Sequence, residues 1–132
     1  MVLQVCKVNE MLSKIRLELA RSPGRPDGDS LTGYEFIAPL DGNGMIDADQ
    51  WHLNKAKCQV LRFRRDEASE LGHLIRKPGG SWAFHYDWAG PAEDDDAGYR
   101  FGSHDFKPGE YVSVREDDDL LTYKVISIVP YG

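Results

Sequence analysis

The chain has 132 residues, is 41% hydrophobic and carries a net charge of −6, with 16 basic residues against 22 acidic ones. This length and composition predict one globular domain over residues 1–132 and exclude a disordered chain. Nucleic-acid binding needs clustered Lys and Arg, and a membrane span needs roughly 20 apolar residues; the sequence has neither, so we expect no nucleic-acid and no membrane partner.

The first ten residues lie outside the pattern that follows them. They are too short and too often interrupted by charge for a secretory signal, and a second methionine, Met11, precedes the better-patterned sequence. We interpret residues 1–10 as an extra leader or a loose end. Cys6 and Cys58 lie far apart without a C-x-x-C motif, which indicates free thiols and a cytoplasmic location.

Alternation with a period of two dominates the rest of the chain. Ile15, Leu17 and Leu19 share one face, and the charged residues between them share the other, as a half-buried strand requires. Turns rich in Pro, Gly and Asp separate such runs. The predicted strands are residues 15–20, 33–38, 58–64, 73–77, 82–88, 98–104, 110–115 and 120–129.

Residues 39–51, PLDGNGMIDADQW, are similar to the calcium loop of an EF-hand. Aligning Gly44 with the sharp-turn glycine of that loop puts Pro39 at the first ligand position and Gln50 at the last, so both strong anchors are missing. We therefore interpret DGNG as a turn and Asp47 as a helix N-cap, with Gln50 completing a capping-box-like pair. No metal is expected here.

Together these elements predict a mainly β fold. We expect an antiparallel, barrel-like or strongly curved sheet of about eight short strands, with one short helix over about 47–57 between the second and third strands. Closure or curling would remove the open edges that so many short strands would otherwise leave.

The aromatic run WAFHYDW places four large side chains on one face: Trp82, Phe84, Tyr86 and Trp88. Buried, such residues build a core; exposed, they stack on a sugar ring or a base. We favour the core. Trp88 and Tyr99, nearest the acidic loop between them, are expected to be partly exposed and are candidate ligand-binding residues.

His73 and His85 flank a Pro-Gly-Gly turn. If residues 78–80 form a three-residue loop, the two histidines face each other with Cβ atoms about 4.5–5.5 Å apart, close enough to share a zinc ion or a proton. A two-residue loop instead places Phe84 opposite His73. Without an H-x-H motif or a cysteine pair, we expect no metal, and we retain His73, His85 and His104 as candidate ligand-binding residues.

The sequence contains no coherent catalytic set. Residues 103–105, Ser-His-Asp, are chain neighbours, whereas a triad converges in space, and there is no G-x-S-x-G elbow. The acidic runs 93–96 and 116–119 are expected in hydrated turns, unsuited to acid–base chemistry. Three arginines within residues 62–65 are compatible with a small local anion site.

Three segments, GYEFIAPLDGNGMIDADQW (33–51), GHLIRKPGGSWAFHYDW (72–88) and GYRFGSHDFKPGEYVSV (98–114), resemble a family of small uncharacterised bacterial proteins, a domain of unknown function. The resemblance covers about residues 14–129 and implies no activity. Residues 106–128 are similar to a strand–turn–strand of the flavin-binding barrel in ferredoxin-reductase-type enzymes, but the run 122–125 departs from the flavin-contact pattern. We expect no cofactor.

These observations predict a small, soluble, non-catalytic binding or interaction domain whose partner is an unidentified small molecule or protein. The alternative is a small metal- or ligand-dependent enzyme with a histidine-containing pocket. The sequence indicates no oligomeric state.

Overall fold

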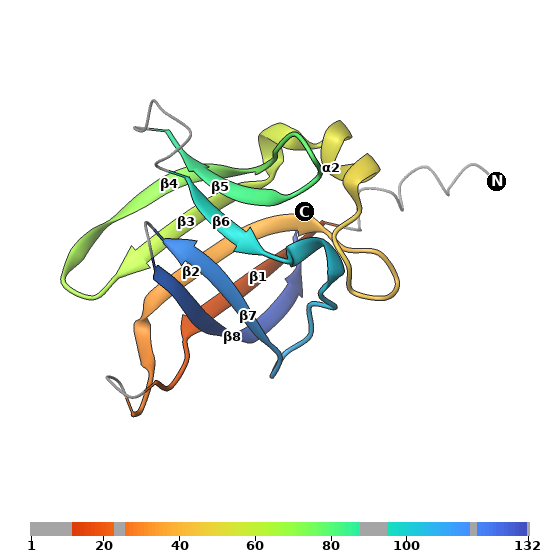
Figure 1. The fold of residues 1–132 in the computed structure, drawn as a ribbon. Coiled ribbons are helices and arrows are strands. Elements are labelled where there is room, and N and C mark those ends of the chain that lie inside the picture. The colour runs from red at the N-terminus through yellow and green to blue at the C-terminus, as the bar shows by residue number, and fades with distance from the viewer. Residues whose placement is uncertain (1–11, 23–25, 88–94, 117–118, 132) are drawn as a thin grey trace.

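The computed structural model describes residues 12–22, 26–87, 95–116 and 119–131. The strands within these ranges are β1 (Leu12–Leu19), β2 (Asp29–Pro39), β3 (Gln59–Arg64), β4 (Glu67–Arg76), β5 (Trp82–Tyr86), β6 (Asp96–Tyr99), β7 (Tyr111–Glu116) and β8 (Asp119–Pro130). Each pairs antiparallel with its neighbour in sequence, and β8 pairs with β1, which closes a barrel (Figure 1). The predicted mainly β barrel with one short helix is confirmed.

The up-and-down strand order sorts the connections between two ends of the barrel. One end, which we call the hairpin end, holds the last residues of β1, β3, β5 and β7 and the first residues of β2, β4, β6 and β8. The opposite end, which we call the helix end, has the helix α2 (Ala48–Leu53), the short 3-10 helix η2 (Lys55–Lys57) and a second 3-10 helix, η4 (Phe101–Ser103) (Figure 1). No helix in the described ranges is both long and apolar enough to span a bilayer.

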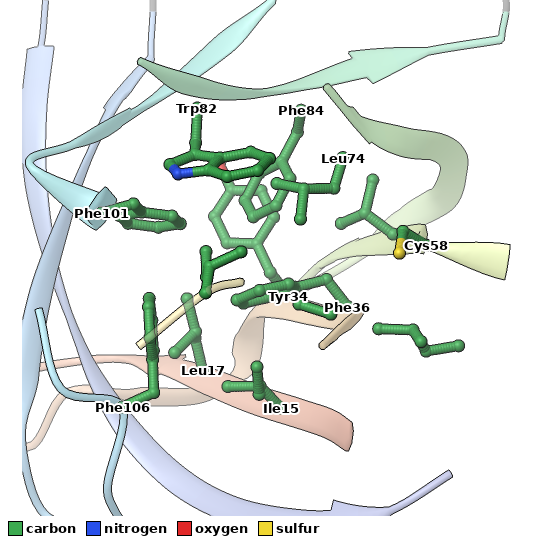
Figure 2. Close-up of a cluster of buried hydrophobic side chains, with 14 of the residues drawn as sticks. Ile15, Leu17, Tyr34, Phe36, Cys58, Leu74, Trp82, Phe84, Phe101 and Phe106 are labelled. Atoms are coloured by element: carbon green, nitrogen blue, oxygen red, sulfur yellow. The ribbon is translucent and has the colours of Figure 1, made fainter. Parts of the chain in front are cut away.

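Apolar side chains from the inward faces of the strands pack as one cluster (Figure 2). Phe84 lies near its centre, with ring centroids 5.1 Å from Phe36 and 5.9 Å from Phe101, and Phe101 lies 5.3 Å from Phe106. Trp82, Phe84 and Tyr86 are all buried, which confirms the core role predicted for the aromatic strand. The barrel interior is therefore a packed core.

The sixth strand ends earlier than the sequence pattern suggested. The prediction of a strand over 98–104 is wrong beyond Tyr99, because η4 follows and turns Phe101 into the core. Gly98 makes room for that ring: a Cβ at this inward position would lie 2.5 Å from it. Packing of one aromatic ring thus overrides the alternating pattern.

The turn and cap predicted in place of a calcium loop are confirmed, although the predicted helix over 47–57 is divided between α2 and η2. The Asp47 carboxylate accepts hydrogen bonds from the N–H groups of Asp49, at 3.0 Å, and Gln50, at 3.1 Å. The reciprocal half of the capping box is not formed. Asp47 instead donates its own N–H to Pro39, at 2.8 Å.

Candidate functional site

Toward the hairpin end, the strands that build the apolar core direct polar side chains into the barrel. Tyr34 lies two positions before Phe36 on β2, and Tyr86 lies two positions after Phe84 on β5, so each tyrosine shares the inward face of its phenylalanine. The polar group, which we call the tyrosine–carboxylate cluster, consists of Tyr34, Arg62, Arg64, Tyr86, Asp96, Glu116 and Tyr123.

The Tyr34 hydroxyl connects the two carboxylates of this cluster. Its oxygen lies 2.9 Å from Asp96 Oδ2 and 2.6 Å from Glu116 Oε2. Tyr86 donates to the same Asp96 oxygen, at 2.7 Å, and Tyr123 donates to the same Glu116 oxygen. Five strands, β2, β5, β6, β7 and β8, thus meet in one hydrogen-bonded chain.

The Tyr34 hydroxyl has one proton for two carboxyl neighbours. Each phenol has one proton to donate, so Tyr34 serves only one of its two carboxylate neighbours. Glu116 also accepts a hydrogen bond from the Arg64 guanidinium. Burial raises the pKa of Asp96. The surroundings of Asp96 therefore favour its neutral form more than water does.

Two arginines bring positive charge to the cluster. Burial lowers the pKa of the Arg64 guanidinium, but the adjacent Glu116 outweighs this effect and the net pKa rises. Arg62 Nε lies 3.6 Å from Asp96 Oδ2, and another nitrogen of Arg62 donates to Glu70, at 3.1 Å. The ion pairs offset part of the desolvation cost of placing carboxylates inside a barrel.

The phenols of the cluster remain neutral. Burial raises the pKa values of Tyr34, Tyr86 and Tyr123 well above the ordinary range for tyrosine. A phenol held in this form, with its proton committed to a carboxylate, is a hydrogen-bond donor and not a nucleophile or general base. The arrangement suits fixed positioning better than turnover.

A cleft of about 680 Å³ opens at the hairpin end, beside this cluster. Arg64 belongs to both, because it lines the cleft while bonding Glu116 in the cluster. The other residues that line the cleft are Leu19, Ala20, Arg21, Ser22, Asp29, Thr32, Arg65, Asp66, Glu67, Leu120, Leu121 and Thr122.

An ion pair spans one wall of the cleft. The Arg65 guanidinium donates to both oxygens of Asp29, at 2.7 and 3.1 Å, and the Thr32 hydroxyl donates to one of them, at 2.9 Å. The hydrogen bonds from Arg65 hold the pKa of Asp29 well below its usual range. This pair connects the start of β2 to the β3–β4 turn and orders the cleft entrance.

The predicted histidine pair forms, but the third histidine does not join it. Lys77 donates its N–H to Ser81, at 2.7 Å, which closes the three-residue loop, and His73 lies directly opposite His85. His104 follows η4 at the helix end. Within the described ranges, no three His, Cys, Asp or Glu side chains group in a way that could hold a metal ion.

The two aromatic candidates lie at the edge of the described structure. Trp88 is outside the described residues. Tyr99 ends β6, where its backbone lies opposite Ser113 on β7. Among the described residues, the hairpin-end cleft is lined by ones that the sequence did not single out as ligand contacts, apart from the arginines within 62–65.

The prediction that both acidic runs are hydrated turns is wrong for three of their members. The Asp95 side chain is only 2% exposed. Asp96 and Glu116 have only 4% and 8% of their surfaces exposed. Alternation contained the missed signal: Val112 and Val114 point inward, so the same period places Glu116 inward. Arg64 likewise shares the face of Val60. The clustering of acids suggested turns, although Asp96 begins β6 and Glu116 ends β7.

The fold and the site define a closed antiparallel barrel whose interior is apolar toward one end and polar beneath a cleft at the other. Compared with models of protein families, with curated proteins and with solved structures, the chain matched none. Function is therefore argued from the cleft, the cluster and the outer surface of the barrel.

Proposed function

We propose that this protein is a small non-catalytic binding domain that holds a polar small molecule in the hairpin-end cleft. The observation that carries the proposal is the cleft itself, at about 680 Å³, with Arg64 in its lining held by a buried carboxylate. Small-molecule sites occupy clefts of about 300–1,000 Å³ with a few convergent polar groups on apolar walls. The cleft has this size and this mixed lining.

Core packing favours the cleft over the barrel lumen as the binding place. Phe36, Phe84 and Phe101 occupy the lumen with van der Waals contacts between their rings, so a ligand there would have to displace the core. At the hairpin end, by contrast, the Arg64–Glu116 and Arg65–Asp29 pairs hold side chains in place before a ligand arrives. Preorganisation of this kind reduces the entropic cost of binding.

The charges of the cleft favour a ligand that carries both an anionic group and hydrogen-bond donors. Arg21, Arg64 and Arg65 supply guanidinium groups, which pair well with a carboxylate or phosphate. Asp66 and Glu67, in the β3–β4 turn, supply acceptors on the same rim. A small amino-acid-like or phosphorylated polar compound can pair with both the guanidinium groups and the carboxylate acceptors.

We also propose that the protein works in the bacterial cytoplasm. Its segments resemble a bacterial family, and its cysteines lack a disulfide pattern. Cys58 is buried, and that burial raises the pKa of its thiol to about 11, so it behaves as a small core hydrophobe and not as a reactive thiolate.

The proposal is tested by ligand-observed NMR with a panel of amino acids, sugars and phosphorylated metabolites. Thr122→Trp places a large side chain at an exposed position of the cleft lining without removing a cluster residue, so it should abolish binding of any ligand found. The matched control, Ser81→Trp, introduces the same side chain in the exposed β4–β5 turn at the helix end and should bind normally.

Two results would contradict the proposal. One is a panel with no binder at millimolar concentration. The other is a ligand that still binds Thr122→Trp with unchanged affinity, since its site would then lie elsewhere. Circular dichroism of both variants checks that they keep the barrel.

A further inference from the structure

The outer face of the barrel wall carries a row of polar side chains with metal-binding chemistry. On β4, His73 lies between two direct cross-strand neighbours, Gln59 on β3 and His85 on β5. Residues paired in this way have side chains on the same face of the sheet. The row lies away from the hairpin-end cleft, whose lining includes none of these residues.

Each imidazole has a carboxylate at its Nδ1 atom. His85 Nδ1 lies 2.6 Å from Asp95 Oδ1, and His73 Nδ1 lies 3.3 Å from Asp87 Oδ1. The Asp95 side chain is only 2% exposed, and its second oxygen lies 3.5 Å from the Lys77 ammonium. Burial and the nearby Lys77 ammonium thus restrict the position of the Asp95 carboxylate, and this carboxylate in turn restricts the orientation of the His85 ring.

A carboxylate at Nδ1 leaves the other ring nitrogen, Nε2, to act as a metal ligand. Metal-binding histidines commonly donate one N–H to a carboxylate, which sets the tautomer and raises the basicity of the coordinating nitrogen. Within the described part of the chain, neither Nε2 has a hydrogen-bond partner. Both side chains remain accessible, with exposures of 38% and 35%.

We propose that His73 and His85 together bind one transition-metal dication through their Nε2 atoms. Imidazole ligands favour Zn²⁺, Cu²⁺ and Ni²⁺ over the harder cations Mg²⁺ and Ca²⁺. Because the described residues supply no third His, Cys, Asp or Glu to such a group, water completes the coordination. The site is open, so the metal exchanges readily.

The first test is calorimetric titration of tag-free protein with Zn²⁺, and with Mg²⁺ for comparison. We expect one Zn²⁺ per chain and no heat with Mg²⁺. His85→Ala and His73→Ala should each abolish one-to-one binding. His52→Ala is the matched control, because His52 is an exposed histidine on α2, outside the row, and its loss should leave the affinity unchanged.

The second test uses the unmodified protein and so does not depend on the folding of a variant. The electron paramagnetic resonance spectrum of one equivalent of Cu²⁺ should show two coordinated nitrogens.

A third test changes the carboxylate beside one ligand. Asp87→Asn keeps both histidine ligands but replaces the carboxylate at His73, and it should weaken Zn²⁺ binding by about tenfold.

The proposal is overturned if Zn²⁺ gives no saturable binding up to about 1 mM, since a site that weak would stabilise the fold negligibly. It is equally overturned if His52→Ala lowers the affinity as much as His85→Ala does, or if bound Cu²⁺ shows a single nitrogen ligand.

Discussion

The two halves of the barrel interior are built from the same strands but hold different chemistry. Toward the helix end, Phe36 on β2 and Phe84 on β5 contact further rings in an apolar cluster (Figure 2). Two residues along the same strands, Tyr34 and Tyr86 contribute hydroxyl groups that bond to Asp96. These tyrosines differ from the phenylalanines by one hydroxyl oxygen each, yet the phenylalanines lie in the apolar cluster and the tyrosines join the polar network.

The comparison shows that burial alone does not decide how a position contributes to stability. An apolar side chain stabilises roughly in proportion to the surface it removes from water. A buried ion pair pays a desolvation cost of similar size to its Coulomb gain, so its net contribution is small. Removing one member is nevertheless expensive, because the other charge is then left without a partner. The two halves should therefore respond differently to mutation.

The largest effect is expected in the apolar half. Phe84→Ala removes a fully buried ring that contacts Tyr34, Phe36 and Phe101, and it should lower the free energy of unfolding by about 4 kcal/mol. Urea denaturation measures this change. A loss below about 1 kcal/mol would show that the cluster collapses around the cavity and is less tightly packed than the ring distances indicate.

The next largest effect is expected in the polar half. Glu116→Ala leaves Arg64 without its carboxylate and removes the acceptor of Tyr34 and Tyr123, so we expect a loss of about 3 kcal/mol. Glu110→Ala, which removes an exposed glutamate before β7, is the control and should change stability by no more than about 0.5 kcal/mol. Equal effects of the two variants would refute the network.

The raised pKa of Asp96 gives a pH-dependent test of the same network. The folded-state pKa is raised, so the stabilisation is complete below the unfolded pKa of about 3.9 and is lost as the pH rises through the folded value. Asp96→Asn imitates the neutral acid and does not titrate. Its stability relative to the native protein should therefore rise with pH across that window.

Urea unfolding of both proteins over a series of pH values measures this difference. A constant difference at every pH would mean that Asp96 titrates alike in the folded and unfolded states. A fall in the relative stability of the variant as the pH rises would mean that Asp96 is ionised in the barrel and that Tyr34 shares one proton between two carboxylates.

The smallest effect is expected outside both halves, at the turn that is similar to a calcium loop. Asp47→Ala removes the α2 N-cap and should cost about 1 kcal/mol with or without calcium. Calcium should leave the melting temperature of the native protein unchanged, because the loop lacks its first and last carboxylate ligands. A calcium-dependent rise that disappears in Asp47→Ala would restore the metal interpretation.

The sequence by itself determined the local features of this protein. Period-two alternation predicted the strands, because successive side chains in an extended chain point to opposite faces. The Pro-Gly-Gly loop length offered only two registers for His73 and His85, and in the folded barrel the closed three-residue loop places them opposite each other. The capping role of Asp47 depended on neighbours within three residues, and so it too could be predicted.

Only the tertiary structure decided the chemistry of the interior. Tyr34 meets Asp96 across 62 residues and Glu116 across 82, and no local pattern specifies which distant side chains a closed barrel brings together. Amino-acid composition alone does not distinguish an acidic residue at the end of a strand from one in an acidic turn. Asp96 and Glu116 are buried because closure turns those strand ends inward, where phenols and guanidinium groups from other strands replace the water that a turn would supply.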